Sequence, residues 1–201
     1  MTKNKEKVKR LVLIGMLTAV LIIMSYTPLG YLNIGPLAIT LNVIPVALTA
    51  ISLGPVAGAV MGAVFGLTSF LQCIGIGGTS AMGAVLFGIS PVLAFIQRFV
   101  PRVLMGFLTG TVYKAISKTG KQKTACFVTG FSAAFLNTVL FMGALVILFG
   151  NTEYVKELMG GKNVLVFICT FVGINAVFEM IASTLITGTV GTALTKSRLI
   201  K

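Results

Sequence analysis

Long apolar stretches, separated by short polar or Gly-Pro breaks, dominate the pattern of this sequence. Apolar residues predominate over residues 8–26, 38–53, 56–71, 101–116, 124–148 and 164–194. A helix that crosses a bilayer needs about 20 mainly apolar residues. The pattern therefore predicts an all-α integral membrane protein with about six transmembrane helices, and it assigns residues 1–201 to a single membrane domain.

Proline and glycine residues mark the predicted helix ends. The first helix ends at Thr27-Pro28-Leu29-Gly30, and Gly54-Pro55 forms a tight turn between the second helix and the third. Residues 72–100 are rich in glycine and serine, which predicts a structured loop or a broken helix. Pro101 then takes the first position of the fourth helix, where its missing N–H group is tolerated.

Composition and charge favour a membrane setting. Hydrophobic residues make up 56% of the chain and charged residues only 10%, whereas a soluble domain carries about 25% charged residues. A formal net charge of +12 would suggest a nucleic-acid partner for a soluble protein, but here the basic residues flank the apolar stretches. They gather before residue 11, over residues 114–123 and over residues 196–201. By the positive-inside rule, both termini are expected in the cytoplasm and residues 72–100 outside a prokaryotic plasma membrane.

Several kinds of site lack the residues that they need. The chain has three cysteines and no histidine, which argues against a disulfide framework and a Cys/His metal site. The sequence holds no nucleotide-binding Gly-rich loop ending in Gly-Lys-Ser/Thr, so any ATP hydrolysis would belong to partner subunits. With no histidine and only four acidic residues, few general bases are present. The sequence therefore predicts no catalytic residues, no cofactor and no enzymatic activity of its own.

Arg98 and Arg102 are the first candidates for a substrate site, because charged side chains within or beside membrane helices are costly. Arg102 is expected in the first turn of the fourth helix, where the helix dipole disfavours a cation by about 0.3–1 kcal/mol. Its planar guanidinium group would offset this cost by pairing with a carboxylate in an outward-facing pocket. In the alternative interpretation, both arginines extend to the outer headgroups and bind no substrate.

Glu179 is the one acidic residue within a predicted transmembrane helix, and Asn175 precedes it by one helical turn. Glu179 either contacts the substrate or pairs with an arginine inside the protein. Asn42 at the start of the second helix and Asn137 in the fifth helix supply amide groups. Each amide binds either the substrate or a neighbouring helix.

Two smaller features complete the set of candidate residues. Thr68 and Gln72 place a hydroxyl and an amide at the outer end of the third helix, where they either bind substrate or form a polar helix end. Gly15 and Ala19 form a small-xxx-small pattern in the first helix. Such a pattern lets another helix approach closely, either within this chain or from a partner subunit.

The order of these motifs resembles that of a known family of membrane proteins. The likeness covers nearly the whole chain, beginning with the basic N-terminus and the Gly15/Ala19 pattern. It continues with Ile44-Pro45-Val46, Leu53-Gly54-Pro55-Val56-Ala57-Gly58, Phe65-Gly66-Leu67-Thr68-Ser69-Phe70 and Pro101-Arg102-Val103-Leu104. The chain resembles the substrate-binding S components of energy-coupling factor (ECF) vitamin transporters, and among them it looks most like the pantothenate type.

This resemblance implies a subunit of six transmembrane helices that binds a vitamin with high affinity at its extracellular face. The subunit would associate with a transmembrane scaffold subunit and two ATPase subunits, and would topple in the membrane to release the vitamin inside. By the same likeness, Gly15 and Ala19 match the surface of the first helix that faces the scaffold subunit.

Pantothenate is the first expected substrate, because its carboxylate suits Arg102. Another water-soluble vitamin, such as riboflavin, folate or a pyridoxine-like compound, is an alternative within the same family. A stand-alone secondary transporter with Glu179 as its proton carrier is the alternative from a different class.

Overall fold

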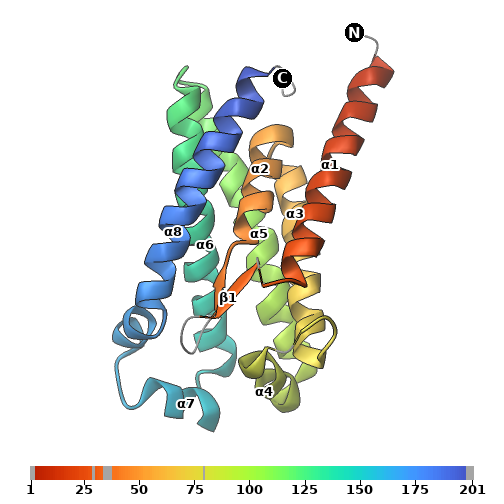
Figure 1. Cartoon of the computed structure of the whole chain (residues 1–201). Coiled ribbons are helices and arrows are strands. Elements are labelled where there is room, and N and C mark those ends of the chain that lie inside the picture. Colours follow the sequence, from red (N-terminus) through yellow and green to blue (C-terminus); the bar gives the residue numbers. More distant parts are fainter. Residues whose placement is uncertain (1–2, 29, 34–37, 79, 198–201) are drawn as a thin grey trace.

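The computed structural model describes residues 3–28, 30–33, 38–78 and 80–197 of the chain. Most of these residues belong to long helices that run side by side along one axis (Figure 1). The start of α1 (Lys3–Ser25) and the end of α8 (Val164–Lys196) lie at the same end of this bundle, which we call the terminal end. The short helices α4 (Ala81–Ile89) and α7 (Glu153–Met159) lie at the opposite end.

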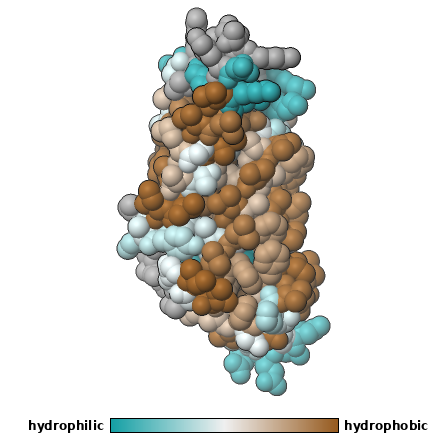
Figure 2. All heavy atoms as spheres, turned by 90° about the vertical axis from the view of Figure 1, so that its right-hand side faces the viewer, coloured by the Kyte–Doolittle hydropathy of each residue, from teal (hydrophilic) through white to brown (hydrophobic). Residues whose placement is uncertain are grey.

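Within the described residues, five helices are long and apolar enough to cross a membrane. Besides α1 and α8, they are α3 (Pro55–Leu71), which continues into the 3-10 turn η1 (Gln72–Ile74), α5 (Pro91–Ser117) and α6 (Gln122–Phe149). Hydrophobic side chains cover the middle of the face in Figure 2, and hydrophilic side chains gather at its two ends. This distribution suits a bilayer, whose apolar core is bounded by water on both sides. The prediction of a helical membrane protein is confirmed.

The sequence also predicted most of these helices individually. The predicted first, third, fifth and sixth helices correspond to α1, α3, α6 and α8. Gly54 forms the predicted tight turn before α3 with a positive φ of 92°, a conformation that glycine adopts without strain. Pro55 then takes the first position of the helix, as expected for a residue without an N–H group.

The predicted second helix is shorter than its apolar stretch suggested. Residues 38–40 form strand β2 (Ala38–Thr40), which pairs antiparallel with β1 (Tyr31–Asn33), and helix α2 begins only at Val43 and ends at Leu53. At 11 residues, α2 is about 16 Å long, roughly half the thickness of a bilayer core. It contacts α1, α3, α5, α6 and α8, which explains why all its residues except Leu53 are buried.

Helix α5 corrects the prediction for the fourth transmembrane helix. It begins at Pro91 rather than at Pro101, and the Ser90 hydroxyl caps it by accepting a hydrogen bond from the Leu93 backbone N–H group (3.4 Å). Serine followed by proline favours a helix start, because serine accepts from a free N–H group and proline needs no acceptor there. The run of glycines that precedes Ser90 concealed this signal in the sequence. Pro101 and Arg102 therefore lie inside the helix, and the first-turn dipole argument for Arg102 was wrong.

Residues 72–100 were predicted as a structured loop or a broken helix, and the second description is correct. The described part of this segment contains η1, α4 and the first ten residues of α5. Helix α4 is capped at its start by the Ser80 hydroxyl, which accepts a hydrogen bond from the Gly83 N–H group (3.2 Å). The segment therefore turns back on itself at the opposite end of the bundle and leads into α5.

A stripe of glycines brings α3 and α5 into backbone contact. On α3, Gly58, Gly62 and Gly66 recur every fourth residue and so lie on one face of the helix. A Cβ atom at Gly58 would collide with the carbonyl oxygen of Gly106 on α5, and one at Gly62 would collide with the carbonyl oxygen of Arg102. Small residues at this spacing let two membrane helices approach until their backbones touch.

Two clusters of buried apolar residues lie along the bundle. The first cluster joins α1, α2, α3, α5 and α6 and comprises Leu21, Val43, Ile44, Val46, Ala47, Leu48, Met61, Phe65, Met105, Ala133 and Ala134. The second cluster lies toward α4 and α7 and comprises Met82, Leu86, Ala94, Met142, Leu145, Phe149, Val155 and Phe167. The residues between these clusters on α3, α5, α6 and α8 contain the polar candidates.

We expect Gly106→Ala to lower the free energy of unfolding by about 1–3 kcal/mol, because the added methyl group collides with the Gly58 carbonyl oxygen and forces α3 and α5 apart. Thermal unfolding in detergent should show a Tm that is several degrees lower. The control is Gly143→Ala on α6, where a Cβ atom would meet nothing within 4 Å and the helix propensity of alanine should leave Tm equal or higher. A Gly106→Ala variant as stable as the wild type would contradict the close α3–α5 contact.

Candidate substrate-binding site

A layer of buried polar side chains separates the two apolar clusters. On α5, polar residues lie between Ala94 of the second cluster and Met105 of the first, and on α6 Asn137 lies between Ala134 and Met142. We define the polar layer by its buried polar members on α5, α6 and α8, which are Gln97, Arg98, Arg102, Asn137 and Glu179. Because a bilayer supplies no water at this depth, these groups must bind one another or a substrate.

Arg102 occupies the centre of the polar layer. Its side chain is 4% exposed, and its Nη1 atom donates a hydrogen bond to the backbone carbonyl of Arg98 (2.8 Å). The guanidinium carbon lies 4.5 Å from the ring centroid of Phe65 and 4.7 Å from that of Phe141. Two aromatic faces at these distances stabilise a cation and restrict the motion of the planar group. Arg102 is therefore a pre-oriented cation inside the protein.

Arg98 joins several elements at the opposite end of the bundle. It donates hydrogen bonds to the hydroxyls of Ser69 on α3 (3.5 Å) and of Ser80 at the start of α4 (3.2 Å). Its guanidinium carbon lies 5.1 Å from the Phe141 centroid. On α7, burial raises the pKa of Tyr154, while the positive charge of Arg98 acts in the opposite direction. Arg98 therefore links the polar layer to α3 and to the start of α4.

The burial of both arginines bears on the headgroup interpretation. Arg98 is 6% exposed and Arg102 is 4% exposed, and their side chains contact groups of α3, α5 and α6 and, for Arg98, the Ser80 hydroxyl at the start of α4. A side chain that extends to lipid headgroups would be exposed at its charged end. The headgroup interpretation is therefore wrong.

Glu179 on α8 is held from a neighbouring helix and lies near strand β2. Its Oε1 atom accepts a hydrogen bond from Asn137 Nδ2 on α6 (3.2 Å), and α8 packs beside β2, where Thr40 is buried. Arg102 lies close enough to interact with it electrostatically. The Asn137 amide thus binds a neighbouring helix, α8, which is one of the two roles expected for it. Glu179 connects α6, α8 and the β1–β2 ribbon.

Thr68 and Gln72 make their hydrogen bonds with α1. The hydroxyls of Thr68 and Ser25 lie 3.2 Å apart, and Gln72 Nε2 donates to the Ser25 carbonyl oxygen (2.6 Å). The Thr68 hydroxyl also donates to the backbone carbonyl of Phe65 (3.0 Å). These two predicted site residues therefore join the ends of α1 and α3, and their bonded groups do not belong to the polar layer.

Asn42 and Asn175 are both buried. Asn42 lies immediately before α2 and is 0% exposed, and its amide nitrogen and oxygen have no hydrogen-bond partner among the residues that the structure describes. Asn175 is 9% exposed and lies one turn before Glu179 on α8. Asn42 therefore places a buried amide without a described hydrogen-bond partner at the base of the β1–β2 ribbon.

Gln97 is a polar residue that the sequence analysis missed. Its side chain is 0% exposed, and neither amide atom has a partner within the described part of the chain. Residues 72–100 were predicted to form a structured loop or a broken helix, where an amide side chain is unremarkable. Because α5 begins at Pro91, Gln97 lies on the same buried helical face as Ala94 and Arg98. This helical spacing is the sequence signal that could have identified Gln97 as a buried polar residue.

The charge of the polar layer favours an anionic ligand. Of the charged side chains that the structure describes, the buried ones are Arg98, Arg102 and Glu179, so the layer carries more positive than negative charge. A guanidinium group held between two aromatic rings can donate two parallel hydrogen bonds to a carboxylate. No cluster of three or more His, Cys, Asp or Glu side chains suited to a metal ion occurs in the same described residues.

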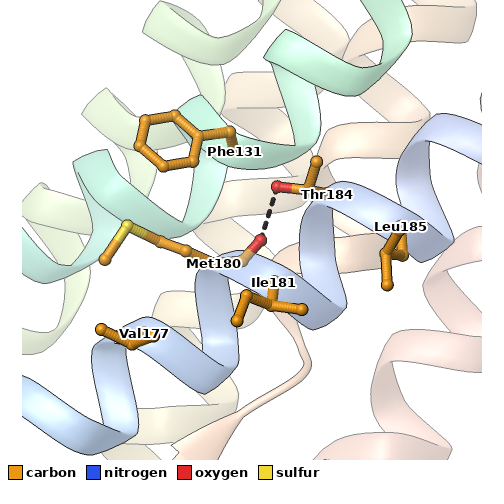
Figure 3. A pocket seen from close by; sticks show the side chains of 6 residues that line it. All are labelled: Phe131, Val177, Met180, Ile181, Thr184 and Leu185. Carbon is orange, nitrogen blue, oxygen red and sulfur yellow. Dashed lines mark hydrogen bonds between the residues drawn. The ribbon is translucent and has the colours of Figure 1, made fainter.

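An apolar recess lies apart from the polar layer. It has a volume of about 410 Å³ and is lined by Phe131, Val177, Met180, Ile181, Thr184 and Leu185 (Figure 3). The Thr184 hydroxyl donates to the backbone carbonyl of Met180 (2.5 Å), so it offers its proton to the helix. Val177, Ile181 and Leu185 are each more than half exposed. The recess is therefore a lipid-facing groove between α6 and α8 and lacks the groups that bind a charged substrate.

The small residues of α1 face away from the bundle. Gly15 and Ala19 are both exposed, and a Cβ atom at Gly15 would meet nothing within 4 Å. This surface therefore does not serve close packing within the chain. Neighbouring apolar residues of α1, such as Leu11 and Met16, are also exposed. An apolar surface with a small-residue centre is suited to contact with lipid or with another helix.

Comparisons with known sequences find relatives that match nearly the whole chain. The family model described as "ECF transporter, substrate-specific component" matches residues 9–191. The pantothenic acid transporter PanT of Lactococcus lactis subsp. cremoris is 26% identical over 97% of this chain and 98% of its own length. The pantothenate transporter PanT of Leuconostoc mesenteroides subsp. mesenteroides is 29% identical over 95% of this chain and 94% of its own length. The chain belongs to the family of substrate-specific components of ECF transporters.

Proposed function

We propose that this chain is the high-affinity pantothenate-binding subunit of an ECF-type importer. The observation that carries the proposal is the buried excess of positive charge formed by Arg98 and Arg102 against Glu179. An anionic substrate would balance that charge in a site from which lipid and protein exclude water. The names of the two relatives, both transporters of pantothenate, support the choice of this carboxylate vitamin.

In this proposal the protein crosses the membrane six times, with α2 as the sixth and shortest transmembrane helix. Both termini lie in the cytoplasm, and α4, α7 and the β1–β2 ribbon lie on the extracellular side. The basic residues at the terminal end, among them Lys7, Lys9, Lys118, Lys121 and Lys196, support this orientation under the positive-inside rule. The chain is then a multi-pass protein of the prokaryotic plasma membrane, and the substrate reaches the polar layer from the outside.

Arg102 binds the carboxylate of the vitamin in this proposal. Phe65 and Phe141 hold the guanidinium group in one orientation, which lowers the entropy lost when the substrate binds. Arg98, one turn away, contributes a second positive charge. Asn42, Asn137, Asn175 and Glu179 contribute amide and carboxyl groups from the facing elements, whereas Thr68 and Gln72 support the site through α1.

Transport in this proposal requires partner subunits. The family to which the chain belongs delivers its substrate together with a transmembrane scaffold subunit and two ATPase subunits, and this chain contains no nucleotide-binding loop. The exposed surface around Gly15 and Ala19 is where the scaffold subunit would pack against α1. The chain itself is a non-enzymatic transport protein.

We expect Arg102→Lys to weaken pantothenate binding by about ten- to hundredfold, because lysine cannot form two parallel hydrogen bonds to a carboxylate. Isothermal titration of the purified protein in detergent measures the Kd of each ligand. The two ligands are pantothenate and pantothenol, in which an alcohol replaces the carboxylate. The variant should lose affinity for pantothenate much more than for pantothenol. The matched control is Arg10→Lys, an exposed arginine near the start of α1, which should bind as the wild type does. Equal losses for both compounds would exclude Arg102 as the carboxylate anchor, and tight binding of a different vitamin would redirect the assignment of substrate.

We expect Gly15→Leu to lower pantothenate uptake by about tenfold or more without changing binding, because a large side chain prevents the close approach of a partner helix. The assay is ATP-dependent uptake into proteoliposomes that contain the chain with its scaffold and ATPase subunits. Gly143→Leu is the control, since this glycine of α6 also has no atom near a Cβ position. Uptake by this chain alone, driven by a proton gradient, would contradict the proposal and favour a secondary transporter that uses Glu179.

A further inference from the structure

Gln97 is an unsatisfied polar side chain in the interior of a membrane helix. It is 0% exposed, and its amide oxygen and nitrogen both lack a hydrogen-bond partner among the described residues. An amide that is removed from water without a compensating partner destabilises the folded protein. A residue that served only packing would be apolar at this position, as Ala94 is one turn earlier.

The backbone at Gln97 presents a further free acceptor. In an α-helix the carbonyl of residue 97 would accept a hydrogen bond from the N–H group of residue 101. That residue is Pro101, which lies inside α5 and has no N–H group. Gln97 therefore combines a side-chain donor, a side-chain acceptor and a backbone carbonyl without its usual donor at one buried position.

The location of these groups connects them with the substrate site. Gln97 is adjacent in sequence to Arg98, and both residues lie on α5 between the two apolar clusters. Arg98 and Arg102 carry positive charge and donate hydrogen bonds, whereas the amide of Gln97 is neutral and can both donate and accept. The polar layer thus contains a cationic part and a neutral part on the same helix.

We propose that Gln97 and its carbonyl form a neutral subsite that binds the hydroxyl or amide groups of the substrate. This inference rests on the proposed function, in which Arg102 binds the carboxylate at the other end of the same molecule. Pantothenate carries two hydroxyls and an amide in addition to its carboxylate, so it has groups of both kinds. Gln97 then determines specificity by distinguishing polar carboxylates from simple fatty acids, whose apolar chains would leave the amide without a partner.

The test is Gln97→Met, which keeps nearly the same volume and removes the amide. A substrate-binding role and a purely structural role of Gln97 predict opposite results. If Gln97 serves the substrate, the variant has a ligand-free Tm higher by about 2–4 °C, because an unsatisfied buried amide is lost, and a Kd for pantothenate about ten- to hundredfold higher. Gln122→Met, at an exposed position at the start of α6, is the control and should change neither quantity.

Titration with pantothenol separates this inference from the carboxylate anchor. Gln97→Met should weaken binding of pantothenate and pantothenol by the same factor, whereas Arg102→Lys should weaken mainly pantothenate. A Gln97→Met variant that binds both compounds as the wild type does, or that has a lower Tm with unchanged affinity, overturns the subsite while leaving the proposed function intact. A wild-type protein that binds neither compound overturns both.

Discussion

The contact between α3 and α5 is the interaction on which the rest of this structure depends. In a membrane, helices gain little from burying apolar surface against one another, so close packing and hydrogen bonds must hold them together. Gly62 packs against the carbonyl of Arg102, and a Cβ atom at Gly66 would lie 3.2 Å from the carbonyl of Arg98. The α5 backbone that carries both arginines is therefore held directly against α3. The positions of the two cations depend on Gly58, Gly62 and Gly66, because a side chain at any of these positions would push α5 away.

The second constraint is the cost of polar groups in a medium without water. The polar layer meets this cost by placing Arg102 between Phe65 and Phe141, which come from opposite sides of the layer, and by joining Asn137 to Glu179 across α6 and α8. Gln97 is an exception to this rule. Departures from complete hydrogen bonding concentrate at functional sites, where a substrate supplies the missing partner. In the proposed function, the layer combines a rigid framework with polar groups that bind the substrate.

Much of the fold was predictable because membrane helices depend on local properties of the chain. Helices α1, α3, α6 and α8 agree with the apolar stretches, and the Gly54-Pro55 turn agrees with its dipeptide. The errors occurred where local signals competed. The apolar residues before Val43 form a strand that pairs with a preceding segment. The glycines before Ser90 predicted an interrupted helix and placed the helix start at Pro101, whereas α5 begins at Pro91. A proline inside a helix is tolerated when neighbouring helices support it, which the sequence alone does not reveal.

The sequence by itself determined that this protein is a bundle of membrane helices and that a few charged and amide side chains lie within them. Those features follow from hydropathy, which is a sum over neighbouring residues. Only the tertiary structure decided which polar residues already bind one another. Thr68 and Gln72 bind Ser25, which is 43 and 47 residues away, and Asn137 binds Glu179, which is 42 residues away. Contacts at such separations depend on how whole helices pack. At the contact between α3 and α5, for example, the role of the glycines appears only when the two backbones meet.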